Sequence, residues 1–531
     1  MYLCQALSHL RYNLDSFANA LKSLGIEHIV VSPGSRNAPI VAGFIRIGGF
    51  RMLSAPDERA AAFMALGSAQ ATGKPAVVIC TSGTAVLNLY PGICEAYYQR
   101  IPLIALTADR PENLIDQWDG QTIHQENIFE KHILHSFHPK TDLHKKEAEQ
   151  ELLYFASQAA GISSGMPNGP VHINIPLSEP IYQNLDSPVA TSFNVPEKPA
   201  KPTTLEFQIP DKCISAEKIL FLVGQKKPDN DVSRILQGIS VHYPVVADVL
   251  SHVDGKNIIK GTENISALTE QHRPDILITL GLGVVSKSLK QELRKLNIPA
   301  HIQLGDGGFT GDPFFTQPET IHIPAAVFLE ILLKTRYSKP CPAFYDAWQS
   351  VIKESELKDT EAALVKTIVN LIPDNSCLQL ANSMTVRHAN RCKNLPDRIF
   401  GNRGTSGIDG SVSTAVGYAW AKPEQKVYSI TGDIGFLYDK NAWWCNPLPK
   451  NILVIIINNH GGMIFDRLQG PEKLPELRNF VHTEHHFNAK AIAEHYEVSY
   501  NACNAIELLR NLNDLKGFIE NISGILEIFT P

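Results

Sequence analysis

Short apolar segments recur along the chain, and many of them end in a turn of glycine and polar residues. Ile29–Val31 runs into Ser32–Arg36, and Ala76–Cys80 runs into Thr81–Gly83. A helix-like segment at residues 57–73 separates these two strands, with an acidic start and a glycine stop. Apolar strands that alternate with helices are typical of doubly wound parallel sheets. The pattern therefore predicts an α/β fold.

The length and two proline-rich stretches indicate several domains. A chain of 531 residues is long enough for about three or four domains. Residues 185–210 and Ser338–Pro342 are rich in proline, which is typical of linkers. We predict three doubly wound parallel-sheet domains, at residues 1–185, 205–337 and 350–531.

Composition excludes several classes of protein. A net charge of −6 and a pI near 6.3 argue against nucleic-acid binding, which usually needs a basic surface. No segment approaches the roughly 20 apolar residues of a membrane span, and the first residues lack the pattern of a signal peptide. The nine cysteines form no C-x-x-C pair, which favours reduced thiols. We expect a cytoplasmic protein without a membrane span.

Two strand ends in the last third carry oxygen ligands. Val427–Ile430 leads to Asp433, and Ile452–Ile457 leads to Asn459 and a glycine turn at Gly461. Taken alone, Asp433 or Asn459 could be an ordinary turn residue instead of a ligand. Parallel strands, however, bring both ends to one edge, where oxygen ligands suit Mg²⁺ and glycine turns suit a diphosphate. The combination predicts a metal-diphosphate site.

Charged residues at other strand and helix ends are weaker candidates. Glu58 begins a helix, where an acidic residue can simply complement the helix dipole. Arg36 lies in a turn after a strand and offers a fork for a carboxylate. Arg110, Arg387 and Arg403 lie beside other strand ends or helix starts. Each could be a surface cation, but together they favour an anionic substrate with several carboxylates.

Three further sets allow two interpretations. Gln121 and His124 lie in a polar loop and could be structural. Ile464 and Phe465 follow the glycine turn, as core residues or as the wall of a cofactor cleft. The pair His485-His486 has no partner at metal-ligand spacing, so we expect it at the surface.

These motifs together resemble thiamine diphosphate enzymes of the acetohydroxyacid synthase and pyruvate decarboxylase superfamily. The segment from Gly432-Asp433 to Asn458-Asn459 is similar to their metal-diphosphate motif, although Ile434 replaces a second glycine. Within the superfamily the chain resembles the SEPHCHC synthases, the MenD family. The similar segments are Val31–Arg36, Cys80–Ala85, Thr107–Pro111, Asn402–Gly410 and Asn459–Phe465.

The resemblance implies the thiamine diphosphate-binding fold and a transferase reaction of menaquinone biosynthesis. Thiamine diphosphate with Mg²⁺ or Mn²⁺ would decarboxylate 2-oxoglutarate and add the succinyl unit to isochorismate, forming SEPHCHC and CO₂. It also implies a homodimer or a dimer of dimers with the active site between subunits. No FAD is expected, because Gly281-Leu282-Gly283 is too short for a dinucleotide fingerprint.

The resemblance also implies roles for individual residues. Glu58 would be the catalytic glutamate at the aminopyrimidine ring, and Asp433, Asn459 and the Gly461 carbonyl would be metal ligands. The residues implied around substrates and catalysis are Ser35, Arg36, Arg110, Gln121, Lys287, Ser383, Arg387 and Arg403. Those implied around the cofactor, with Glu58, are Gly83, Gln121, Ser406, Ile408, Asp433, Ile434, Asn459, Ile464 and Phe465. Ser288 follows Lys287 where some relatives have a basic residue.

Two alternatives remain open at this point. One is another thiamine diphosphate enzyme, such as a 2-oxo acid decarboxylase or an acetohydroxyacid synthase-like enzyme, against which the arginine set argues. The other is a non-catalytic binding protein with the same fold, against which Glu58, Asp433 and Asn459 argue.

Overall fold

The computed structural model describes residues 13–139, 145–179, 193–195, 207–305, 307–308, 310–335, 339–353, 359–467, 476, 478–521 and 523–531. The chain divides into two compact units. The first unit comprises Met1–Ala200, Gly404–Glu424 and Tyr438–Ile452, and the second comprises Lys201–Arg403, Gln425–Leu437 and Leu453–Pro531. This division differs from the three expected domain ranges, whose boundaries stay a prediction. Most of the expected linker at 185–210, and Ser338 of the other, lie outside the described residues.

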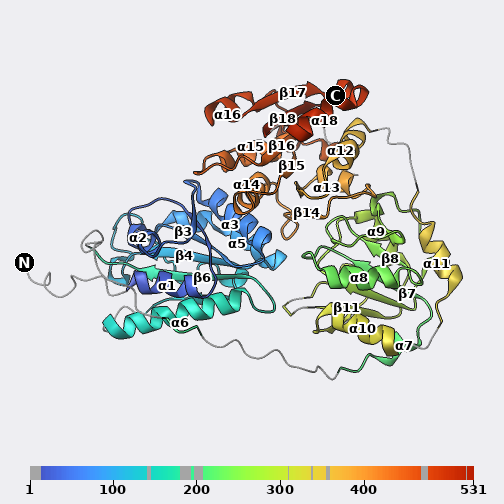
Figure 1. The fold of residues 1–531 in the computed structure, drawn as a ribbon, viewed down its shortest axis with the longest axis horizontal. Coiled ribbons are helices and arrows are strands. Elements are labelled where there is room, and N and C mark those ends of the chain that lie inside the picture. The colour runs from blue at the N-terminus through green and yellow to red at the C-terminus, as the bar shows by residue number, and fades with distance from the viewer. Residues whose placement is uncertain are drawn as a thin grey trace, which may run out of the picture. The chain divides into compact units, whose positions relative to one another are not determined.

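The first unit contains a six-stranded sheet in the order β2-β1-β3-β4-β6-β5 (Figure 1). Its strands are β1 (His28–Val31), β2 (Arg51–Ser54), β3 (Ala76–Cys80), β4 (Leu103–Asp109), β5 (His135–Phe137) and β6 (Pro170–Pro176). The pairing is parallel, and Val30 of β1 lies opposite both Leu53 and Val78. The predicted strands at 29–31 and 76–80 are therefore confirmed.

Helices cover both faces of this first sheet (Figure 1). They are α1 (Leu14–Ser23), α2 (Ala38–Ile47), α3 (Glu58–Thr72), α4 (Thr84–Asn88), α5 (Tyr90–Gln99) and α6 (Lys145–Ser163). Ile29 and Val31 point into one core with α1, α2 and α6, because alternate residues of a strand face the same side. Helices α3 and α5 lie against the other face.

Helix α3 is anchored at its start and along its length. The Asp57 side chain accepts hydrogen bonds from the backbone N–H groups of Arg59 and Ala60 at 2.9 and 3.2 Å, so it caps the helix before Glu58. Helix α14 (Ser411–Ala421) packs closely along α3. A Cβ added at Gly417 would lie 2.0 Å from the carbonyl oxygen of Met64. Only glycine therefore permits this approach of the two helices.

The second unit contains the other two sheets, and the first of these has the order β12-β11-β10-β7-β8-β9. Its strands are β7 (Ile219–Val223), β8 (Val245–Ala247), β9 (Ile258–Ile259), β10 (Ile276–Leu280), β11 (His301–Leu304) and β12 (Glu319–Ile321). Its helices are α7 (Asp211–Ser215), α8 (Asn230–Ile239), α9 (Lys287–Lys295), α10 (Ala325–Thr335) and α11 (Pro342–Gln349). The strand order is that of dinucleotide-binding folds, in which ligands bind where the order reverses.

The remaining sheet has the order β14-β13-β15-β16-β18-β17 (Figure 1). Its strands are β13 (Cys377–Leu380), β14 (Arg398–Gly401), β15 (Val427–Gly432), β16 (Ile452–Asn458), β17 (Tyr500–Asn504) and β18 (Gly524–Phe529). Its helices include α12 (Thr360–Leu371), α13 (Met384–Ala389), α15 (Asp433–Tyr438), α16 (Lys490–His495), α17 (Ala505–Arg510) and α18 (Leu512–Asn521). The order repeats that of the first sheet, a symmetry that the sequence did not reveal.

Two expectations from composition can be compared with these elements. Among the described residues, no helix combines the length and the apolar character that a bilayer crossing requires. The eight cysteines in the described ranges are all free thiols.

The contact between α3 and α14 yields a stability prediction. Gly417→Ala should lower the midpoint of thermal unfolding, because overpacking of this kind costs about 1–3 kcal/mol. Gly238→Ala in α8 is the matched control, since nothing lies within 4 Å of the added Cβ. That control should unfold at the wild-type temperature or slightly above it. Equal midpoints for both variants would show that the two helices do not pack this closely.

Candidate active site

The turn after β1 lies against the end of β3. The Ser32 hydroxyl donates to the carbonyl of Ala55 at 2.8 Å, which fixes the start of the turn. A Cβ added at Gly34 would lie 2.4 Å from the Cβ of Thr81, so a glycine is needed there. Ser35 follows at the exposed tip of the turn. Two of the segments singled out in the sequence are thus neighbours at the carboxyl edge of the first sheet.

Arg36 and Arg110 share one protein carboxylate. Arg36 is only 2% exposed and donates to the carbonyl of Leu177 and to Glu179 Oε1, both at 2.8 Å. Arg110 donates to the carbonyl of Gly120 at 2.9 Å and lies 3.8 Å from the same Glu179 oxygen. The two guanidinium groups therefore form one cationic site. The Glu179 side chain is 60% exposed, so this ion pair lies at the edge of the solvent.

A buried chain of amides connects three strand ends of the first sheet. Gln125 accepts from the backbone N–H of Gly83 at 2.8 Å and donates to Asn174 Oδ1 at 2.8 Å. Asn174 in turn donates to Asp109 Oδ2 at 2.6 Å. The sequence suggested Gln121 in this loop, but Gln121 is exposed, although it lies close to Gly83. Gln125 and Asn174 went unnoticed, although a polar residue inside an apolar strand such as β6 is a signal.

Glu58 occupies the first turn of α3, partly buried beside the end of β3. Its Oε2 accepts from the side-chain amide of Asn88 at 3.2 Å. Burial raises the pKa of the Cys80 thiol well above its ordinary value, and the charge of Glu58 adds to that effect. Among the described residues, Glu58 is therefore a carboxylate bonded to one side-chain amide, through one of its two oxygens.

Glu95 fixes the loop that carries two predicted cofactor contacts. Its buried carboxylate accepts from the backbone N–H groups of Gly404 and Thr405, both at 2.7 Å. Ser406 and Ile408 follow on the exposed part of the loop. Sequence reasoning missed Glu95, because nothing in its helix distinguishes it from a surface glutamate.

In the second unit, Asp433 begins α15 directly after β15 and is buried. One carboxylate oxygen accepts from the backbone N–H of Ile434 at 2.7 Å, and the other accepts from Gly461 at 3.0 Å. Burial raises the pKa of Asp433, while these N–H groups and the charge of His485 oppose the rise. The expectation that the ends of β15 and β16 meet is confirmed by the contact between Asp433 and Gly461.

The donor atoms around Asp433 fit a hard cation. Asn459 Oδ1 is buried and has no hydrogen-bond partner among the described residues. A Cβ added at Gly461 would lie 2.7 Å from the His482 ring, so only glycine fits there. A carboxylate and an unsatisfied amide oxygen at one strand edge are the ligands that Mg²⁺ prefers. These residues could therefore hold a metal and a diphosphate.

The expectation that His485-His486 lies at the surface is wrong for His485. Its Nε2 lies 3.2 Å from Asp433 Oδ2, and its side chain is 6% exposed, whereas His486 is exposed. The packing of its segment against the β16 turn buries it. Ile464 and Phe465 lie in the short helix η6 (Met463–Arg467) and are half-buried.

The segments after β13 and β14 hold three more predicted residues, of which Arg387 lies in α13. Ser383 precedes α13 with a φ of 73°, and its carbonyl accepts from Arg387 at 2.9 Å. Arg403 donates to Asn382 Oδ1 at 3.0 Å, which joins the two turns. Lys287 is the exposed first residue of α9.

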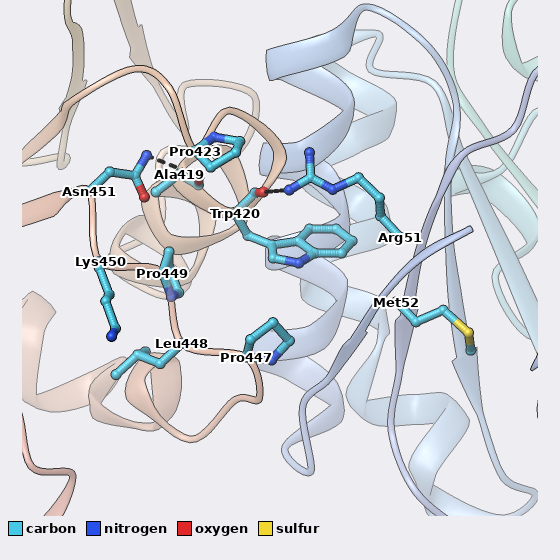
Figure 2. Close-up of a pocket in the computed structure, with 10 residues that line it drawn as sticks. All are labelled: Arg51, Met52, Ala419, Trp420, Pro423, Pro447, Leu448, Pro449, Lys450 and Asn451. Carbon is cyan, nitrogen blue, oxygen red and sulfur yellow. Dashed lines mark hydrogen bonds between the residues drawn. The ribbon is translucent and has the colours of Figure 1, made fainter. Parts of the chain in front are cut away.

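A separate pocket in the first unit contains none of the predicted site residues. Figure 2 shows Trp420, Pro447, Leu448 and Pro449 around it, with Arg51 at its edge. The Arg51 guanidinium donates to the carbonyls of Trp420 and Ala421 at 2.6 and 3.0 Å. No acidic side chain lines the pocket, and its Arg51 guanidinium is already bonded, so we assign the pocket no role.

Comparisons with known proteins agree with this geometry. Two family models match, "Thiamine pyrophosphate enzyme, N-terminal TPP binding domain" over residues 14–132 and "Thiamine pyrophosphate enzyme, C-terminal TPP binding domain" over residues 381–519. An X-ray structure described as a thiamin diphosphate-dependent enzyme of Mycobacterium smegmatis superposes with a TM-score of 0.67 at 17% identity. The superposition covers 98% of this chain and 99% of the solved chain, and at this identity it shows a shared fold only. The chain thus has the fold of the thiamine pyrophosphate enzymes.

Three relatives define the family within that class. A Cytophaga hutchinsonii protein is 38% identical over 95% of this chain and 94% of its own length. A Flavobacterium johnsoniae protein is 36% identical over 97% of this chain and 96% of its own length. A Desulfotalea psychrophila protein is 34% identical over 98% of this chain and 98% of its own length. All three are named 2-succinyl-5-enolpyruvyl-6-hydroxy-3-cyclohexene-1-carboxylate synthase. The chain belongs to this family, abbreviated SEPHCHC synthase, and the resemblance seen in its motifs is confirmed.

The buried chain of amides yields a prediction on pH dependence. Burial raises the pKa of Asp109 from 3.8 to about 7, opposed by the Asn174 hydrogen bond and the charge of Arg36. The folded chain therefore binds this proton more tightly than the unfolded chain, and this group's contribution to stability falls as the pH rises toward 7. Asp109→Asn should remove that fall, so its stability relative to wild type should be greater at about pH 8 than at about pH 5.

Urea unfolding at the two pH values measures this difference. Asp346→Asn, at an exposed position of α11, is the control and should show the same offset from wild type at both pH values. A constant offset for Asp109→Asn as well would mean that Asp109 is ionised across this range.

Proposed function

We propose that the chain is a thiamine diphosphate-dependent transferase that forms SEPHCHC from 2-oxoglutarate and isochorismate in menaquinone biosynthesis. The observation that carries the proposal is the 38% identity, over 95% of the chain, to a relative of that name. In this reaction the bond between C1 and C2 of 2-oxoglutarate breaks and CO₂ leaves. The remaining four-carbon unit then forms a bond to a ring carbon of isochorismate.

The cofactor would be held at both of its ends by residues that this chain contains. When bound, thiamine diphosphate supplies the electron sink for decarboxylation and for the new carbon–carbon bond. Asp433, Asn459 and the carbonyl of Gly461 would bind Mg²⁺ or Mn²⁺ and, through it, the diphosphate. Glu58 would form a hydrogen bond to the pyrimidine ring and control its protonation. The buried carboxylate and the unpartnered amide oxygen support the metal assignment.

The cationic residues would hold the substrates. Each of the two substrates is a dicarboxylate at neutral pH, and arginine binds carboxylates through paired hydrogen bonds. Arg36 and Arg110 are held in place by backbone carbonyls, and the carboxylates beside them are those of Glu179 and Asp119. Both of those carboxylates are exposed, so a substrate carboxylate could compete with them for the two guanidinium groups. The other residues proposed around the substrates are Ser35, Gln121, Lys287, Ser383, Arg387 and Arg403.

One assay tests the proposal as a whole. The protein is mixed with thiamine diphosphate, Mg²⁺, 2-oxoglutarate and isochorismate, and both isochorismate loss and CO₂ release are followed. We expect one CO₂ to be released for each isochorismate consumed. CO₂ release that ignores isochorismate would indicate a different 2-oxo acid decarboxylase. Calorimetry without Mg²⁺-dependent binding of thiamine diphosphate would indicate a non-catalytic binding protein.

We also propose a cytoplasmic homodimer or dimer of dimers. The free cysteines support a reducing compartment. The family resemblance supports an active site shared between subunits, with Glu58 from one chain and Asp433 from the other. Sedimentation measures the assembly, and a monomer that is fully active would contradict this arrangement.

Glu58→Gln should reduce turnover by about 10²–10⁴-fold, the usual contribution of a general acid or base. The amide keeps the size of the side chain, so affinity for thiamine diphosphate and the thermal midpoint should stay near wild type. Initial rates and calorimetry provide the measurements. Glu147→Gln is the matched control, because Glu147 also lies in a helix first turn but is exposed. Wild-type turnover in both variants would leave Glu58 as a helix-dipole residue only.

Asp433→Ala should weaken Mg²⁺-dependent binding of thiamine diphosphate by about tenfold or more, because it removes the only charged ligand of the proposed site. Asn459→Ala should give a smaller loss, because it removes a neutral oxygen. Titration calorimetry at several Mg²⁺ concentrations measures both variants. If neither variant changes the dependence on Mg²⁺, the metal binds elsewhere.

A further inference from the structure

Glu527 is a buried carboxylate in β18, the strand between β16 and β17 (Figure 1). Its neighbours Leu526 and Ile528 point into the apolar core of the last sheet, and alternate residues of a strand face opposite sides. Glu527 therefore faces away from that core, yet it is only 1% exposed. A buried carboxylate is costly unless hydrogen bonds compensate it, so its partners show which segments it holds.

Three donors from three different segments surround the Glu527 carboxylate. Its Oε1 accepts from the side-chain amide of Asn458 at 2.7 Å. Its Oε2 accepts from the backbone N–H of Ala489 at 2.9 Å and from the Tyr500 hydroxyl at 2.7 Å. The carboxylate therefore ties the end of β16 and the start of α16 to β18.

The bond to Asn458 fixes the turn that carries two of the proposed metal ligands. Asn458 is the last residue of β16, and its Oδ1 accepts from the N–H of His460 at 3.0 Å, which closes the turn. Rotation of this amide would aim its oxygen at the Glu527 carboxylate and its NH₂ group at the His460 N–H. Glu527 thus selects the one orientation of Asn458 that closes the turn around Asn459 and Gly461.

The segment at residues 485–489 is attached to the same turn. The N–H of His485 donates to the carbonyl of His460 at 3.1 Å. Asn458 Nδ2 donates to the carbonyl of Phe487 at 3.1 Å as well as to Glu527. One side-chain amide therefore holds both the turn and this segment.

The same segment places His485 against Asp433. His485 Nδ1 accepts from the N–H of Phe487 at 3.2 Å, which leaves Nε2 facing Asp433 Oδ2 at 3.2 Å. Because the N–H of Ala489 is bonded to Glu527, the segment is held at its far end too. Groups behind metal ligands that orient them in this way commonly control metal affinity.

We propose that Glu527 is a positioning residue of the metal-diphosphate site, which it orders through Asn458 and through residues 485–489. The inference rests on the proposed function, since it takes Asp433, Asn459 and the Gly461 carbonyl as the metal ligands. Sequence reasoning missed Glu527, because its partner Asn458 lies 69 residues away in the chain.

A purely structural role is the alternative, in which Glu527 only stabilises the last sheet. Tyr500 separates the two possibilities. Its hydroxyl bonds to the same carboxylate, but it lies in β17, which pairs with β18 and not with β16. Loss of that hydroxyl should therefore affect stability without affecting the metal turn.

Titration calorimetry of Glu527→Gln with Mg²⁺, in the presence of thiamine diphosphate, tests the inference. Glutamine offers one acceptor oxygen and one NH₂ group, so it cannot accept from both Asn458 and Ala489. We expect the Mg²⁺ affinity to fall by about 10–100-fold, as for other residues that orient metal ligands. With saturating Mg²⁺ and thiamine diphosphate, kcat should stay near wild type, because the ligands themselves are unchanged.

Tyr500→Phe is the matched control. It should lower the thermal midpoint measured without metal or cofactor and leave the Mg²⁺ affinity at the wild-type value. If Glu527→Gln keeps the wild-type Mg²⁺ affinity, or if Tyr500→Phe lowers that affinity equally, Glu527 has a structural role only and the inference is wrong. Failure of the proposed function would look different, because wild type itself would show no Mg²⁺-dependent binding of thiamine diphosphate.

Asn458→Ala breaks the same hydrogen bond from the side of the turn and should also lower the Mg²⁺ affinity. The double variant with Glu527→Gln should lose less affinity than the product of the two single losses, because both changes remove one interaction. A loss equal to that product would contradict the inference. If Glu527→Gln does not fold, Asn458→Ala decides alone, and an unchanged Mg²⁺ affinity in it would overturn the inference.

Discussion

Parallel pairing brings the βα turns of each sheet to one edge, and the candidate site depends on that constraint. In the first sheet it places Gly34 against Thr81 and lets Gln125 reach the backbone of Gly83. In the last sheet it brings the N–H of Gly461 to 3.0 Å from the Asp433 carboxylate. A strand that ran antiparallel would carry its turn to the opposite edge, and these contacts would be lost.

The charged groups at these edges are compensated, but only in part. Arg36 is bonded to Glu179, and the buried Asp433 carboxylate has His485 beside it. Because buried charges are stable only with partners, a site with excess positive charge favours anionic ligands over neutral ones.

Prediction from the sequence succeeded where neighbouring strands carry the polar residues directly after their apolar runs. Asp433 and Gly461 follow β15 and β16, which are adjacent in the sheet, so their contact could be foreseen. It failed where the partner is distant and unmarked. His485 looked like a surface residue because only the folding of its segment onto the β16 turn buries it. Gln125 was passed over for Gln121, since exposure distinguishes the two and spacing does not.

The sequence by itself determined the α/β class, the strand ends that carry Asp433 and Asn459, and the family, because these depend on local pattern and motif. Tertiary structure decided which of those groups are satisfied. Among the residues that the structure describes, Asn459 keeps an unpartnered oxygen, whereas both Nη atoms of Arg36 are bonded. The physical reason is that burial and hydrogen bonding are set by residues far apart in the chain. Spacing along the sequence carries no record of those contacts.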